Sequence, residues 1–206
     1  MTDLYVVYNN VISMLKNREY DELIIEGKNT KLIDISLEDF EKLQQPYVII
    51  AKKKDKQLII VIEHTGENKS NVLEKMIKIS MENINKYGKS DIIIIISGKK
   101  TDKTKSLLMT KYEEYSLIFM FYYEFEINPF DNYLTPRQEL LKDKSLLPFK
   151  DTEIPLILVS DRIVRWLGGT DGQILVVYRP DYATKSIVKM YRRIIKVIKN
   201  DQKSSN

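Results

Sequence analysis

The residues best suited to chemistry in this sequence are acidic and basic side chains around a single histidine. His64 follows an apolar stretch that ends at Glu63. An imidazole can serve as a general base, but the sequence places no serine or cysteine as its nucleophile and offers no second histidine for a metal pair. We therefore interpret His64 as a polar residue at the end of a strand.

A divalent-metal site is the other chemistry that this region could support. Nucleases of the restriction-endonuclease type use two carboxylates and a lysine on adjoining strand ends to hold Mg²⁺ and activate water. Glu67 and Lys69 fit the loose acid-x-Lys pattern, with Asp55 and Glu63 nearby, but the expected Pro-Asp pair is missing. Such triplets arise often in a chain with 30% charged residues. A Mg²⁺-dependent nuclease is therefore kept only as an alternative, and we expect no catalytic residue, metal or other cofactor.

The composition excludes several classes of protein. The chain has no cysteine, so disulfides and thiolate metal sites are absent and we expect a reducing, intracellular location. Its first residues lack the pattern of a signal peptide, and the longest apolar run, Ile92 to Ile96, is far too short to cross a bilayer. A net charge of +4 is too small to indicate nucleic-acid binding by itself.

The first 130 residues show the alternating pattern of an α/β domain. Apolar residues at steps of three and four predict helices over 4–15, after Ser36, over 70–87 and over 104–114. Strands are predicted on either side of a turn at 53–56, at 91–97, and from 117 to about 125. The run of isoleucines does not alternate, so we expect a central strand buried on both faces. The pattern fits a restriction-endonuclease-like α/β fold without its catalytic residues.

The segment 127–135 is rich in Pro, Asp and Asn and predicts a boundary between domains at 1–130 and 131–206. Thr135, Pro136 and Gln138 have the pattern of a helix start. A strand near 156–160, a short helix at 162–168 and a strand at 174–179 then predict a small α+β domain. Residues 187–198 have helical spacing, but Arg179-Pro180 and the turn after it suit a returning strand, and we predict a strand to about Ile194.

The C-terminal motifs are specific. The sequence contains "SDRIVRWLGG", "DGQILVVYRP" and "MYRRI" in that order. The segment from Thr135 to Ile194 thereby resembles the C-terminal domain of shared subunit 5 of DNA-dependent RNA polymerases, which archaea carry as a short separate subunit. The matching positions are Asp161, Val164, Arg165, Gly168, Gly172, Gln173, Arg179, Pro180, Tyr191 and Arg192. Trp166 stands where the family has a tyrosine, and Arg162 replaces a proline.

The N-terminal part resembles, more loosely, the extension that eukaryotic and viral forms of this subunit carry. "VISMLKNREY" is similar to its first helix, and "ENINKYGKSDIIIIISG" to a helix and its central strand. The wealth of Ile, Lys and Asn indicates an A·T-rich genome, which favours a large cytoplasmic DNA virus as the source. The resemblance then implies the host cytoplasm and the virion as its location, or the nucleus if the protein is cellular.

The resemblance implies a non-catalytic, architectural subunit. The C-terminal domain would dock on the largest polymerase subunit and other core subunits through Asp161, Arg165, Trp166, Arg179, Tyr191 and Arg192. For Trp166, a place in the domain core is an equal alternative. The N-terminal domain would form part of a jaw beside downstream duplex DNA. No membrane and no small-molecule substrate is implied. A stand-alone DNA-binding regulator remains a further alternative.

Two basic loops could lie near phosphates, at Lys52–Lys56 and at Lys99–Lys105. Ammonium groups at loop tips neutralise phosphates without reading bases. The resemblance favours the second loop, and the residues predicted to lie near DNA are Lys99, Lys100, Lys103 and Lys105. The alternative for both loops is a charged, solubilising turn.

Overall fold

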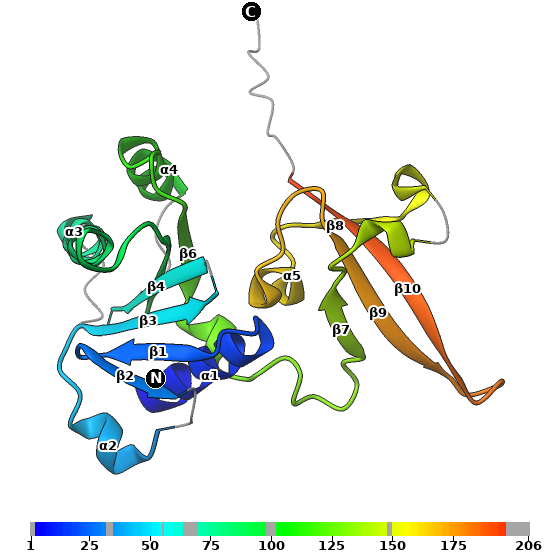
Figure 1. The fold of residues 1–206 in the computed structure, drawn as a ribbon, viewed down its shortest axis with the longest axis horizontal. Coiled ribbons are helices and arrows are strands. Elements are labelled where there is room, and N and C mark those ends of the chain that lie inside the picture. Colours follow the sequence, from blue (N-terminus) through cyan, green and yellow to red (C-terminus); the bar gives the residue numbers. More distant parts are fainter. Residues whose placement is uncertain are drawn as a thin grey trace, which may run out of the picture. The chain divides into compact units, whose positions relative to one another are not determined.

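The computed structural model describes residues 3–31, 35–54, 56–63, 70–97, 102–147 and 150–196. The chain forms two compact units, Met1–Asn128 and Pro129–Asn206. Each unit has its own β-sheet, so the fold is mixed α/β (Figure 1). Within the described ranges, no helix is both long and apolar enough to cross a membrane.

The N-terminal unit is built on one sheet with the strand order β2-β1-β3-β4-β5-β6. The first four strands in this order pair antiparallel, and β4, β5 and β6 pair parallel. The strands are β1 (Glu22–Ile25), β2 (Lys28–Lys31), β3 (Tyr47–Lys53), β4 (Lys56–Ile62), β5 (Asp91–Ile96) and β6 (Leu117–Phe121). The helices are α1 (Leu4–Asn17), α2 (Leu37–Glu41), α3 (Ser70–Tyr87) and α4 (Asp102–Lys111).

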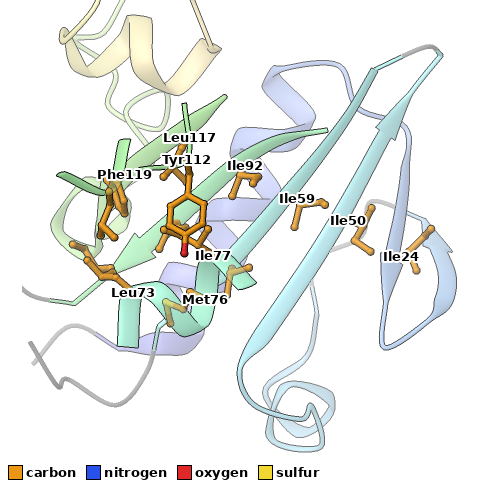
Figure 2. Close-up of a cluster of buried hydrophobic side chains, with 14 residues drawn as sticks. Ile24, Ile50, Ile59, Leu73, Met76, Ile77, Ile92, Tyr112, Leu117 and Phe119 are labelled. Carbon is orange, nitrogen blue, oxygen red and sulfur yellow. The ribbon is translucent and has the colours of Figure 1, made fainter. Parts of the chain in front are cut away.

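The isoleucine run forms the central parallel strand, as predicted. Every residue from Ile92 to Ile96 is buried. The side chains of Ile92, Ile94 and Ile96 share one cluster with Leu73 and Ile77 of α3 (Figure 2). The intervening isoleucines face the other side of the sheet because strand side chains alternate. Burial on both faces explains why this strand shows no alternation in sequence.

The opposite face of the sheet carries a group of aromatic rings. Tyr8 of α1 lies 5.3 Å from the ring of Phe40 in α2 and 6.2 Å from that of Tyr47 in β3. The rings of Phe40 and Tyr47 stack at 5.0 Å. These contacts hold α1 and α2 against the sheet.

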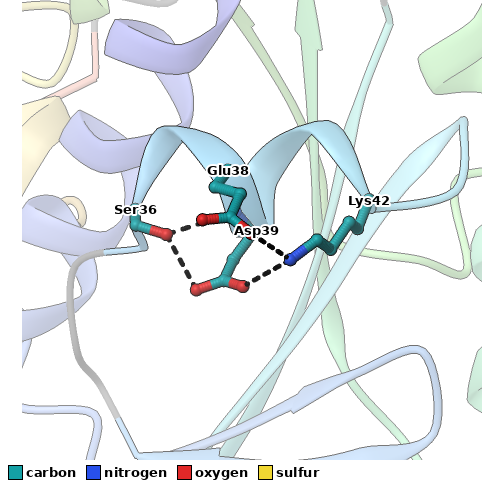
Figure 3. Close-up of polar contacts among 4 residues, drawn as sticks. All are labelled: Ser36, Glu38, Asp39 and Lys42. Carbon is teal, nitrogen blue, oxygen red and sulfur yellow. Dashed lines mark hydrogen bonds and ion pairs between the residues drawn. The ribbon is translucent and has the colours of Figure 1, made fainter.

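The short helix α2 begins at its predicted cap. The Ser36 hydroxyl accepts a hydrogen bond from the Asp39 backbone N–H at 3.2 Å and donates one to the Asp39 carboxylate at 2.8 Å (Figure 3). Lys42 pairs with Glu38 at 2.9 Å one turn further on. The serine hydroxyl is the main reason that the pKa of Asp39 is lowered. Local hydrogen bonding thus defines a helix of five residues, too short to form by propensity alone.

The C-terminal unit has a smaller sheet with the order β7-β9-β10-β8. Its strands are β7 (Arg137–Leu140), β8 (Leu156–Leu158), β9 (Ile174–Asp181) and β10 (Ser186–Ile195). Strands β7, β9 and β10 pair antiparallel, whereas β8 pairs parallel with the end of β10. The helix α5 (Arg162–Leu167) covers one face, where its Val164 and Leu167 pack with Leu175, Val177 and Ile194.

Two sequence predictions in this unit had opposite outcomes. The strand predicted after residue 186 is confirmed, because β10 pairs with β9 along its length. The helix start predicted at Thr135, Pro136 and Gln138 is wrong, because Arg137–Leu140 is strand β7. The segment after β7 contains a 3₁₀ turn, Lys144–Leu146. The capping pattern was local, and pairing of β7 with β9 outweighed it.

Other differences lie in the N-terminal unit. The predicted strand 117–125 ends at Phe121, and Tyr122–Phe125 form a 3₁₀ turn. The hairpin of β1 and β2 was not predicted, because its strands are four residues long and β2 has no buried residue. Its turn places Glu26 and Gly27 at φ values of 50° and 77°. The remaining predicted helices and strands are present, with bounds shifted by a few residues.

Close packing of α5 on the sheet depends on Gly169. A Cβ atom at this position would lie 2.6 Å from Ile194 Cδ1 and 2.9 Å from Val164 Cγ1. We expect Gly169→Ala to lower the free energy of unfolding by about 1–3 kcal/mol, because overpacking forces the core apart. Urea denaturation measures the loss. Thr170→Ala, at the exposed next residue, is the control and should change stability by less than about 0.5 kcal/mol. Equal stability of the two variants would contradict the close approach.

Candidate interaction surface

Two of the predicted interface residues lie on α5 and a third, Asp161, lies at its start. Asp161 is the N-cap, and its Oδ1 accepts hydrogen bonds from the backbone N–H groups of Ile163 at 2.9 Å and Val164 at 3.2 Å. Gly168 ends the helix at a φ of 72°. The aspartate and the glycine of the motif are therefore explained by helix capping.

Trp166 and Arg165 differ in their access to solvent. Trp166 is 1% exposed, which favours the core interpretation over contact with a partner. Arg165 is half-buried. Of these two residues, Arg165 therefore has more surface to offer.

The other predicted interface residues lie on the ribbon formed by β9 and β10. Arg179 is exposed and pairs opposite Val188. Tyr191 and Arg192 are half-buried and point to opposite faces, because successive strand residues alternate. Arg192 lies opposite Leu175, on the face that α5 covers. The structure therefore distributes the predicted residues over α5 and both faces of the ribbon.

A polar network that sequence reasoning missed crosses three strands. Tyr178 of β9 donates a hydrogen bond from its hydroxyl to Glu139 of β7 at 2.5 Å, and Arg137 donates to the same carboxylate at 2.9 Å. The Arg137 guanidinium lies 5.0 Å from the centre of the Tyr178 ring, and the Lys189 ammonium lies 5.7 Å from it. The network went unrecognised because residues 137–140 had been assigned to a helix.

Exposed apolar side chains accompany this ribbon. Ile187 and Val188 of β10 are 69% and 45% exposed. Leu156 and Leu158 of β8 are also exposed, as is Tyr182 in the turn between β9 and β10. Exposed apolar residues are common singly, but their grouping along neighbouring strands indicates a surface for interaction.

The basic loops differ in what the structure describes. Lys99 and Lys100 lie outside the described residues, and of Lys103 and Lys105 only the backbone, in α4, is described. In the first loop, the Lys53 ammonium pairs with Glu19 at 2.8 Å and donates to the Arg18 carbonyl at 3.2 Å. Lys52 lies 5.8 Å from the Tyr87 ring. These lysines have partners within the unit, which favours the charged-turn interpretation of this loop.

Glu63, one of the carboxylates considered for a nuclease site, lies in a buried environment. Glu63 is 3% exposed, and its Oε2 accepts a hydrogen bond from the Ser97 hydroxyl at 3.0 Å. The Tyr122 hydroxyl donates to the Glu63 backbone carbonyl. Asp55, His64, Glu67 and Lys69 fall outside the described residues. Within the part of the chain that is described, no three acidic, histidine or cysteine residues are grouped so that they could hold a metal ion.

Comparison with known proteins adds no identification. No protein-family model matches the chain, and no curated protein matches it.

The Tyr178–Glu139 hydrogen bond has a consequence for titration. The bond from Tyr178 is the largest cause that lowers the pKa of Glu139, and the pKa of Tyr178 is raised in turn. The stability that the ionised Glu139 adds is therefore present above its unfolded pKa and is lost as the pH falls through the folded value. We expect NMR titration to place the Glu139 midpoint below its ordinary value, and Tyr178→Phe to raise it.

Tyr182→Phe is the matched control, because Tyr182 lies exposed in the ribbon turn and no hydrogen bond to Glu139 depends on its hydroxyl. Its Glu139 midpoint should equal that of the wild type. An unchanged midpoint in Tyr178→Phe would show that the hydrogen bond does not set the titration.

Proposed function

We propose that this protein is a non-catalytic, architectural subunit of a multisubunit DNA-dependent RNA polymerase. Its C-terminal unit docks on the largest subunit, and its N-terminal unit forms part of the jaw beside downstream DNA. A large cytoplasmic DNA virus of the African swine fever virus type is the preferred source. The protein then acts in viral transcription in the host cytoplasm.

One observation carries the proposal: residues shared with the polymerase motif have defined physical roles in a compact unit. Asp161 caps α5, Gly168 ends it in a left-handed conformation, and Gly172 has a φ of 78°. Arg179 and Arg192 lie on the ribbon beside exposed apolar side chains. A small unit with such a surface supports docking on a larger assembly.

The N-terminal unit supports the jaw role less directly. An antiparallel hairpin, β3–β4, leads into parallel strands joined by α3 and α4. We infer that this arrangement is of the restriction-endonuclease type, as the sequence pattern suggested. Glu63 is buried and bonded to Ser97, which supports a unit that retains this type of fold without its chemistry. Fold alone does not imply an activity.

Capture of the polymerase tests docking. The tagged full chain, expressed with the polymerase subunits, should copurify with the largest subunit. Arg165→Glu should lower the captured amount at least tenfold, because charge reversal in an interface opposes binding. Lys78→Glu, at an exposed position on α3, is the charge-matched control and should capture as the wild type does. Absence of the largest subunit from the wild-type eluate would overturn the proposal.

Binding of duplex DNA by the chain alone separates this proposal from the alternatives. A jaw that steadies DNA inside an assembly needs little affinity of its own, and the net charge is only +4. We expect a dissociation constant above about 1 μM at physiological salt, and we expect it to rise further as salt is added. Submicromolar affinity would favour a stand-alone regulator. Mg²⁺-dependent cleavage lost in Glu63→Ala would favour a nuclease.

A further inference from the structure

Strand β10 has a long edge that its own sheet leaves open. β10 runs from Ser186 to Ile195, but β8 pairs with it only at Arg193–Ile195. Among the described residues, no strand pairs with the same side of β10 from Ser186 to Arg192. Figure 1 shows β9 and β10 extending as a two-stranded ribbon.

The direction of the backbone groups along this edge follows from one proline. Pro180 has no N–H and lies opposite Ile187, so these two residues cannot exchange a pair of backbone hydrogen bonds. The odd-numbered residues of β10 therefore turn their N–H and C=O groups away from β9. In agreement, the Arg193 N–H donates to the Pro155 carbonyl at 2.9 Å, on the β8 side. Ile187 and Lys189 direct their groups to the open side in the same way.

A cavity of about 330 Å³ lies where β8 begins. Glu153 and Pro155 line it on one side, and the β10 residues from Lys189 to Arg192 line it on the other. The cavity therefore lies directly along the open edge. It leaves room for the end of an additional strand beside the start of β8.

The β10 side chains along the edge are mostly apolar and basic, and the acidic Glu153 lines the cavity beside them. Ile187 and Val188 are exposed, and Lys189, Arg192 and Arg193 follow, with no acidic residue in β10. The Arg193 Nε atom is buried, and it has no hydrogen-bond partner among the residues that the structure describes. A buried guanidinium N–H without an acceptor is costly, but Arg193 pairs with Leu156 of β8 just beyond the open edge.

These observations identify the kind of occupant. A second copy of this chain, paired through the same edge, would bring basic residues together, and like charges directly opposite each other are destabilising. An acidic segment would instead neutralise them. Neighbouring strands interact through side chains on the same face, so the segment would carry apolar residues opposite Ile187, Val188 and Met190 and acidic residues opposite Lys189 and Arg192.

We propose that the open edge of β10, from Ser186 to Arg192, binds an extended, acidic segment of another protein as an additional strand of the sheet. Main-chain hydrogen bonds to Ile187 and Lys189 supply affinity, and the basic side chains select acidic sequences. That the segment belongs to a polymerase subunit rests on the proposed function. The existence of the open edge and the acidic chemistry of its occupant do not rest on the proposed function.

A short peptide serves as the probe for the full chain. The peptide Val-Val-Glu-Val-Thr-Glu, blocked at both ends and fluorescently labelled, fits the edge in the parallel direction, and its reversed sequence fits the antiparallel direction. Fluorescence anisotropy should show saturable binding of one of them. Methylation of the alternate peptide nitrogens that face β10 should weaken this binding at least tenfold. Replacement of both glutamates of the peptide by lysine should do the same.

A pair of variants tests the backbone contact in the protein. Lys189→Pro removes an N–H that does not bond to β9, and proline is tolerated at such edge positions. Lys189→Ala is the control, because it removes the same charge and keeps the N–H. We expect the proline variant to bind the peptide at least tenfold more weakly than the alanine variant. Circular dichroism checks that both variants are folded.

Equal binding by the two folded variants would overturn the proposal, as would undiminished binding of the methylated peptide. The methylated peptide keeps the test decisive even if Lys189→Pro does not fold. If the wild-type chain did not bind the peptide but still captured the polymerase, strand binding at the edge would be refuted and the proposed function would stand. Peptide binding without any capture of the polymerase would refute the function and leave the edge standing.

Discussion

The C-terminal unit depends on the antiparallel pairing of β9 with β10. The pairing runs from Ser186 opposite Asp181 to Arg193 opposite Ile174. It supplies the apolar surface on which α5 packs, and it fixes which residues face α5 and which face away. A shift of one residue would exchange the two faces and turn Leu175 and Val177 out of the core. The positions of the polar network on Tyr178 and of the open edge follow from the same register.

The N-terminal unit depends on the burial of both faces of its sheet. Its sheet is covered on both faces, with α3 and α4 on one and the aromatic rings around Tyr8 on the other. In open α/β sheets, ligands usually bind beyond the carboxyl ends of the parallel strands. Here the end of β4 is bonded to Ser97 after β5 and to Tyr122 after β6. These contacts tie neighbouring strand ends to one another.

Strong patterns in the sequence predicted much of this fold, and short ones did not. The isoleucine run, the long helix α3 and the Ser36 cap were recognisable because burial or hydrogen bonding acts on neighbouring residues. Strand β7 was mistaken for a helix because its pairing with β9 joins residues far apart in sequence. The Tyr178 network and the open edge of β10 depend on that sheet arrangement. Motif similarity predicted Arg179 and Arg192 as interface residues, but it could not show on which face of the sheet each side chain lies.

The open edge of β10 also affects how copies of the chain behave toward one another. An unpaired strand is a template for self-association, and charged side chains are a common protection against it. Lys189, Arg192 and Arg193 give β10 that protection through mutual repulsion between copies. Such repulsion between exposed charges weakens as ionic strength rises, since the screening length is only about 8 Å in physiological salt. Copies of this chain on their own are therefore better protected against pairing through this edge in dilute salt than in concentrated salt.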